Sequence, residues 1–172
     1  LIKLTKEKQA VEPADKNEFW GVNLPVPSLV NYELDEPNAL LLDKAEVSLD
    51  GDAFRPQKEL LSADNDLRAE LGWPTRQDHV AQPWTVEEPR PEHSVKLRFR
   101  VASDIETDGV KLALEDADVA KIWVNGNLTV AKPDGWFVDK SIGTVAIGTL
   151  HKGENIIEVE LPFGKRTNIE WC

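Results

Sequence analysis

Flat aromatic side chains with planar polar neighbours are the features of this sequence best suited to holding a ligand. The chain has six tryptophans among 172 residues. An indole ring can stack on the apolar face of a sugar, while amide and carboxylate groups hydrogen-bond the sugar hydroxyls. The candidate carbohydrate-binding residues selected in this way are Trp123, Trp136, Asp134, Asn125, Trp84 and Gln82.

Two of these tryptophans are favoured by their local sequence. Ile122 and Val124 alternate with Trp123, so a strand that turns both aliphatic side chains inward points the indole outward. Trp136 follows Asp134 and a glycine, a pattern typical of a turn. The alternative for every tryptophan is packing in the core or against another domain, since large aromatic side chains are usually mostly buried.

A calcium site is a second possibility. The run from Asp104 to Gly109, followed by Glu115, resembles an EF-hand loop, with Asp104, Glu106, Asp108 and Glu115 as candidate ligands. Glu106 stands where a shorter ligand is usual, and strand patterns rather than helices flank the run. The alternative is a charged turn between two strands, and no other cofactor is indicated.

Catalytic patterns are weak in this sequence. Cleavage of a glycosidic bond needs two carboxyl groups across a cleft, but nothing selects a pair among the 31 acidic residues. There is no Gly-x-Ser-x-Gly motif, and the only cysteine is Cys172. The three histidines lack the spacing of metal ligands. We therefore expect this chain not to be an enzyme by itself.

The net charge of -11 argues against binding to nucleic acid or to an anionic membrane surface. No apolar run approaches the roughly 20 residues of a membrane-spanning helix, and no signal-peptide pattern is present. The sequence has no methionine, and it stops inside the apolar run Asn168–Cys172. Both observations suggest a piece of a longer protein, so no cellular location can be inferred.

Short alternating segments predict a β-sandwich or barrel with one inserted helix. Leu60–Leu71 fits a helix in which Asp64 could cap the start and Gly72 could close the end. Asp50-Gly51 predicts a hairpin between residues 46–49 and 53–57. The other predicted strands are Val30–Leu34, Val95–Val101, Val110–Leu114, Ala120–Val124, Val138–Ile147 and Asn155–Leu161.

This pattern divides the chain into residues 1–29, a linker or the tail of a preceding domain, and residues 30–172, the β-sandwich. Residues 75–91 are expected to form a long loop. Lys96, Arg98 and Arg100 form a basic stripe on one strand. The stripe is expected to pair with acidic residues of neighbouring strands, with domain docking as the alternative.

The order of two turn motifs, Trp123–Gly126 and Gly153–Asn155 followed by Val159–Leu161, resembles the jelly-roll, galactose-binding-like domains of bacterial glycoside hydrolases. The C-terminal sandwich of α-L-rhamnosidase-like enzymes is the closer resemblance. It is carried further by Asn38–Asp43, Leu114–Asp116, Gly135–Trp136, Asp139–Ser141 and Pro162–Gly164.

This resemblance implies a non-catalytic accessory module, with carbohydrate and the catalytic domain of the same polypeptide as its partners. The alternative is a purely structural domain that packs on the catalytic domain and has no ligand of its own.

Overall fold

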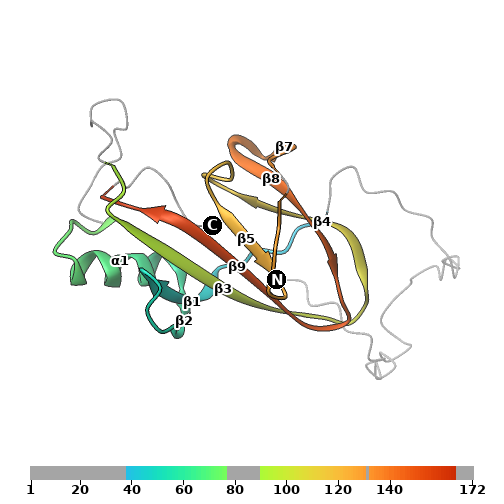
Figure 1. Ribbon diagram of the computed structural model, residues 1–172, viewed down its shortest axis with the longest axis horizontal. Helices are drawn as coiled ribbons and strands as arrows, with labels where there is room; N and C mark the ends of the chain where they lie inside the picture. The colour runs from blue at the N-terminus through green and yellow to red at the C-terminus, as the bar shows by residue number, and fades with distance from the viewer. Residues whose placement is uncertain (1–37, 77–89, 131, 166–172) are drawn as a thin grey trace, which may run out of the picture. The chain divides into compact units, whose positions relative to one another are not determined.

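The computed structural model describes residues 38–76, 90–130 and 132–165, and they form a mainly β structure with one short helix (Figure 1). The elements are β1 (Lys44–Leu49), β2 (Arg55–Glu59), α1 (Leu60–Glu70), β3 (His93–Ser103), β4 (Thr107–Leu114), β5 (Lys121–Val124), β6 (Asn127–Leu128), β7 (Gly135–Phe137), β8 (Asp139–Leu150) and β9 (Gly153–Phe163).

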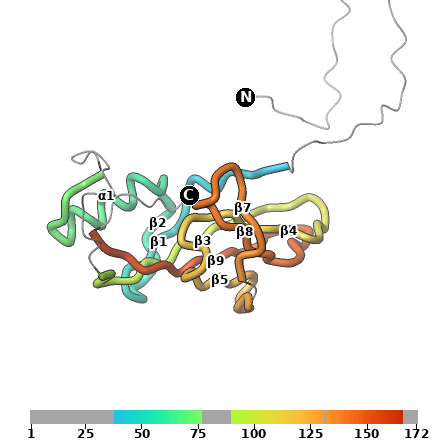
Figure 2. Tube along the Cα trace, turned by 90° about the horizontal axis from the view of Figure 1, so that it is seen from above, coloured from blue at the N-terminus to red at the C-terminus, as the bar shows by residue number. Residues whose placement is uncertain are grey.

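These strands form two antiparallel sheets. The larger has the order β2-β1-β3-β9-β5-β6, and the smaller has the order β4-β8-β7. Figure 2 shows the smaller sheet stacked over one part of the larger sheet, with α1 over the other part. No closed barrel is formed by the described strands, which confirms the predicted mainly β, sandwich-like class.

The longest ladder joins β3 to β9, with eleven residue pairs between His93↔Phe163 and Ser103↔Gly153. Alternate side chains of both strands point inward, where burying each large apolar side chain stabilises the fold by roughly 1.5–3 kcal/mol. The buried residues of these two strands are Val95, Leu97, Phe99, Val101, Asn155, Ile157, Val159, Leu161 and Phe163. The predicted parity of both strands is therefore confirmed.

The helix was located correctly, but the predicted cap was wrong. Glu59 is the N-cap, and its carboxylate accepts hydrogen bonds from the backbone N–H groups of Leu61 and Ser62. Asp64 instead lies buried within the helix, where its carboxylate pairs with Arg68 at 3.0 Å and with Arg76. The burial of Asp64 beside two arginines depends on tertiary packing, which a local capping pattern cannot show.

The end of the helix and the first hairpin follow the predicted turn chemistry. Gly72 adopts a φ of +67° directly after the C-cap, and Asp50 and Gly51 have φ values of +49° and +84°. Such left-handed conformations suit glycine and, less well, aspartate. The hairpin is confirmed, although its second strand begins at Arg55, two residues later than predicted.

All described elements fall within one compact unit, Ala39–Cys172. The predicted strand at Val30–Leu34, the boundary between residues 29 and 30 and most of the predicted loop at 75–91 lie outside the described residues. Among the described residues, no helix is both long and apolar enough to cross a membrane.

Candidate functional site

The Asn-Gly turn after β5 is bonded to β9 through the side chain of Asn125. This residue has a φ of +50°, and its Oδ1 accepts a hydrogen bond from the backbone N–H of Ile156 at 2.8 Å. Its Nδ2 donates to Oδ1 of Asn155 at 3.1 Å. Both ends of the Asn125 amide are thus occupied within the fold, an arrangement that favours a structural role.

Asn155 is fully buried and organises the turn between β8 and β9. Its Oδ1 accepts from the backbone N–H of His151 at 2.9 Å, and its Nδ2 donates to the carbonyl groups of His151 at 2.7 Å and Gly153 at 3.3 Å. The two turn motifs singled out in the sequence are therefore joined physically through the pair Asn125–Asn155. A buried polar side chain is tolerated here because its hydrogen bonds are satisfied.

Asp134 is likewise engaged within the protein. Its Oδ1 accepts from the hydroxyl of Thr144 at 3.1 Å, and its Oδ2 forms an ion pair with Lys111 at 2.8 Å. The hydrogen bond from Lys111, followed by that from Thr144, lowers the pKa of the Asp134 carboxyl. A sugar hydroxyl at this carboxylate would have to share or replace these partners.

Trp136 is the most exposed of the described tryptophans. It lies on β7 opposite Gly143 of β8, and 57% of its surface is accessible. No described cation or aromatic ring stacks on its indole. A methyl group at Gly143 would lie only 2.8 Å from Cβ of Ala117, so the close packing behind this hairpin requires glycine.

The hairpin that carries Trp136 also exposes aliphatic side chains. Val138, at the connection from β7 to β8, is 78% exposed and has a φ of +63°, a rare conformation for a β-branched residue. Val130, on the segment leading to β7, is 89% exposed. Asp139 fixes the start of β8 by accepting hydrogen bonds from the backbone N–H and hydroxyl of Ser141, which lower its pKa.

Trp123 lies on the outer face of the larger sheet, as its parity predicted, and it is half-buried. The Lys96 ammonium group lies 3.8 Å from the centroid of its indole. A cation at this position interacts favourably with the ring and occupies one of its faces. A sugar that stacks on that face would have to displace Lys96.

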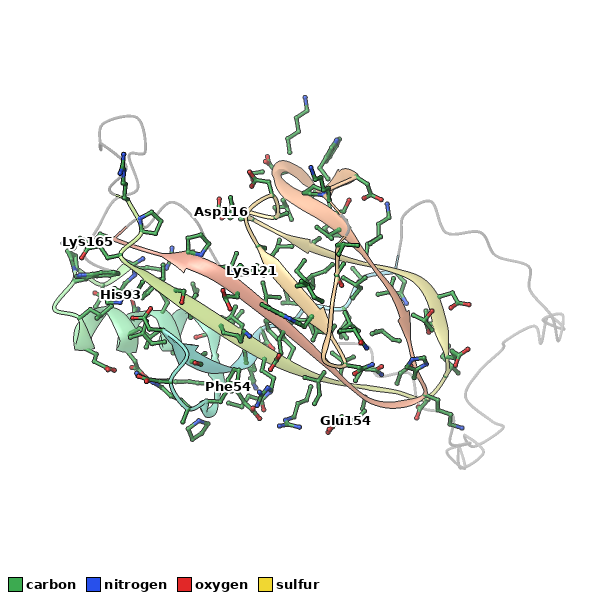
Figure 3. All side chains as sticks on the ribbon, viewed as in Figure 1. Phe54, His93, Asp116, Lys121, Glu154 and Lys165 are labelled. Carbon is green, nitrogen blue, oxygen red and sulfur yellow. The ribbon has the colours of Figure 1, made fainter. Side chains whose placement is uncertain are left out.

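The basic stripe on the same face is paired across the strands. Arg98 contacts Glu46 and Glu158, and Arg100 contacts Glu46 and Glu154. Figure 3 labels Glu154 at the start of β9 and Lys121 on β5, whose ammonium pairs with Glu160. The expected cross-strand pairing is confirmed, and the hydrogen bond from Arg100 is the main cause of the lowered pKa of Glu46.

The calcium candidates do not gather into a metal site. Oδ1 of Asp108 accepts a hydrogen bond from the Thr149 hydroxyl at 2.6 Å, and Glu106 lies 3.5 Å from Nδ1 of His151. Asp104 and Glu106 lie in the short connection from β3 to β4, while Glu115 follows β4. Over residues 38–76, 90–130 and 132–165, no three His, Cys, Asp or Glu side chains are placed to hold a metal ion.

A groove missed by sequence reasoning lies between the β5–β6 hairpin and the end of β8. Its volume is about 360 Å³. The residues that line it are Val124, Asn125, Asn127, Leu128, Thr129, Ile147, Thr149 and His151. Of the predicted ligand residues that the structure describes, only Asn125 lies there, because the groove forms where two segments far apart in the sequence meet.

Of the remaining tryptophans, Trp73 is the one that the structure describes. Trp73 is buried, with its ring centroid 5.3 Å from that of Phe163 and 5.5 Å from that of His93, so it packs in the core. Trp84 and Gln82 lie outside the described residues. Trp123 and Trp136 belong to different sheets, so these two rings form no single aromatic platform.

Comparison with known proteins found no matching family model, no similar curated protein and no similar solved structure.

Proposed function

We propose that this chain is a non-catalytic accessory module of a bacterial glycoside hydrolase and that it binds carbohydrate. The fold would be a jelly roll of the galactose-binding-like kind, to which the observed two-sheet, sandwich-like arrangement conforms. The observation that carries the proposal is the exposed indole of Trp136, held on a short hairpin of the smaller sheet.

The chemistry of this surface suits a sugar. The unstacked ring of Trp136 offers an apolar face. Asp134, directly before β7, is paired with Lys111, and a sugar hydroxyl would share these polar groups. An isolated stacking platform contributes only about 1–2 kcal/mol, so the expected affinity is modest.

A glycan array probed with the full chain tests the proposal. We expect specific binding that Trp136→Ala weakens about tenfold, which corresponds to about 1.4 kcal/mol. Trp123→Ala is the matched control, because Lys96 already occupies a face of that ring, and we expect it to change binding less than twofold. An array on which no glycan binds would overturn the proposal.

A structural role is the second candidate, and the exposed valines favour it. Val130 and Val138 add apolar surface to the segment that carries Trp136, and contiguous apolar patches often mark docking surfaces. In this alternative the segment packs on the catalytic domain of the same polypeptide. The chain would then self-associate with rising concentration in sedimentation experiments, and Val138→Asp would suppress the association. A monomer at all concentrations would contradict this alternative.

A further inference from the structure

The groove between the β5–β6 hairpin and β8 has an aliphatic floor. Val124 and Ile147 are buried at its base, and Leu128 lines its side. Flat aromatic surfaces suit the broad face of a sugar ring, whereas no tryptophan, tyrosine or phenylalanine is among the described residues that line this groove. Aliphatic side chains of this kind pack well against a methyl or acetyl group.

Polar groups with spare hydrogen-bonding capacity surround that floor. Among the described residues, the Asn127 amide makes only one long contact, from Nδ2 to the carbonyl of Asn125 at 3.5 Å. The hydroxyl of Thr129 forms no hydrogen bond with a described residue, and His151 is exposed. Amide, hydroxyl and imidazole groups can each donate to or accept from the hydroxyl groups of a sugar.

The charges around the groove disfavour an anionic ligand. No lysine or arginine of the described part of the chain lines it. Two carboxylates lie just behind the rim, Asp108 against the hydroxyl of Thr149 and Glu106 beside His151. An acidic sugar would be repelled by these carboxylates and would find no lysine or arginine among the described lining residues.

Both walls of the groove are fixed by the same buried side chain. Asn155 bonds to Asn125 in the hairpin wall and to the backbone of His151 in the opposite wall. The backbone of both walls is therefore held in place before a ligand arrives, which lowers the ordering cost of binding.

We propose that this groove binds one neutral saccharide unit that carries a methyl or acetyl substituent, with that substituent on the aliphatic floor and the hydroxyl groups against Asn127, Thr129 and His151. Its volume of about 360 Å³ falls within the range of small-molecule sites. The inference rests on the proposed carbohydrate-binding function and adds a second contact region, separate from Trp136.

The test is a titration of the ¹⁵N-labelled full chain with methyl glycosides, monitored by NMR. The probes are an N-acetylhexosamine, a 6-deoxyhexose, the parent hexose and its uronic acid. We expect chemical-shift changes at the backbone amides of residues 124–129 and 147–151. The substituted sugars should bind at least about fourfold more tightly than the parent hexose, because burying one methyl group contributes about that gain in affinity. The uronic acid is expected to bind most weakly.

Exposed residues provide variants that leave the fold intact. Asn127→Ala and His151→Ala should each weaken binding several-fold, and Lys152→Ala, next to His151 but outside the groove, should not. Shifts confined to residues 134–139, or a preference for the uronic acid, would overturn the groove assignment while leaving the proposed function standing. If no saccharide on the array or in the titration binds, both fall together.

Discussion

Removing the Asn155 side chain should be among the most damaging polar substitutions in this protein. Asn155 is fully buried, and its amide takes part in four hydrogen bonds, of which three are to backbone groups of the β8–β9 turn. A typical intramolecular hydrogen bond contributes about 0.5–1.5 kcal/mol net, and a buried group left without a partner costs about 1–3 kcal/mol. Because the turn is partly accessible to water, we expect Asn155→Ala to lower the free energy of unfolding by about 3 kcal/mol.

The assay is unfolding in urea, monitored by tryptophan fluorescence. For Asn155→Ala we expect a lower urea concentration at the midpoint and an unchanged dependence of the unfolding free energy on urea. Asn127→Ala is the matched control, since the Asn127 amide makes only one long hydrogen bond with a described residue. Its effect should stay below about 0.5 kcal/mol. If Asn155→Ala were as mild as the control, the structural role assigned to the Asn125–Asn155 pair would be refuted.

A double-mutant cycle isolates the contact between the two asparagines. Asn125→Gly removes the amide without straining a backbone that already has a φ of +50°. Since the two side chains are bonded at 3.1 Å, we expect a coupling energy of roughly 0.5–1.5 kcal/mol with Asn155→Ala. Strict additivity would show that the pair is not energetically linked.

Three further predictions concern other parts of the fold. Arg68→Ala should cost about 3 kcal/mol in urea unfolding, because its buried guanidinium pairs with Asp64 and its removal leaves a cavity; an effect below 1 kcal/mol would contradict this burial. The hydrogen bond from His93, followed by that from the Ser94 backbone, lowers the pKa of Asp50 in the folded protein. The ionised Asp50 carboxylate therefore stabilises the fold above its unfolded pKa of about 3.9, and this stabilisation is lost as the pH falls through the lower folded pKa. Asp50→Asn should therefore flatten the acid limb of stability measured between about pH 5 and 2, and an unchanged limb would refute the assignment. Val138→Asn should raise the midpoint of thermal unfolding and increase the free energy of unfolding by about 0.5–1 kcal/mol. Asparagine tolerates the left-handed backbone better than valine does, and the exposed valine buries little apolar surface. A lower midpoint would show that the valine contributes packing.

Strand positions were predictable wherever a strand has one solvent-exposed face and one buried face. The alternation in residues 95–101 and 155–161 placed both central strands and their inward side chains correctly. The short strands β6 and β7 were not predicted, and Trp136 of β7 was expected on a turn, because two or three residues carry no period that can be recognised. The fold class could therefore be predicted from the hydrophobic periodicity, whereas the short strands depend on tertiary contacts that the periodicity does not show.

Predicting the site was harder, because the availability of a polar group depends on its partners. Asn125 and Asp134 are residue types that bind sugars. In the structure, however, the Asn125 side chain bonds to β9, and the Asp134 side chain bonds to Lys111 and Thr144. The partners of Asn125 lie about 30 positions away, at Asn155 and Ile156. The groove likewise joins residues 124–129 to residues 147–151, a meeting that no local pattern signals.

The position of β9 has a consequence for the order of folding. It is the last described strand in the sequence, yet it lies inside the larger sheet, between β3 and β5. Its partners in the long ladder are 50 to 70 residues earlier, from Ser103↔Gly153 to His93↔Phe163. On a ribosome, the strands β2-β1-β3 and β5-β6 would emerge first as two separate pieces with exposed edges. The larger sheet can become continuous only when β9 arrives between them, so we expect slow folding and a need for protection from aggregation until that point.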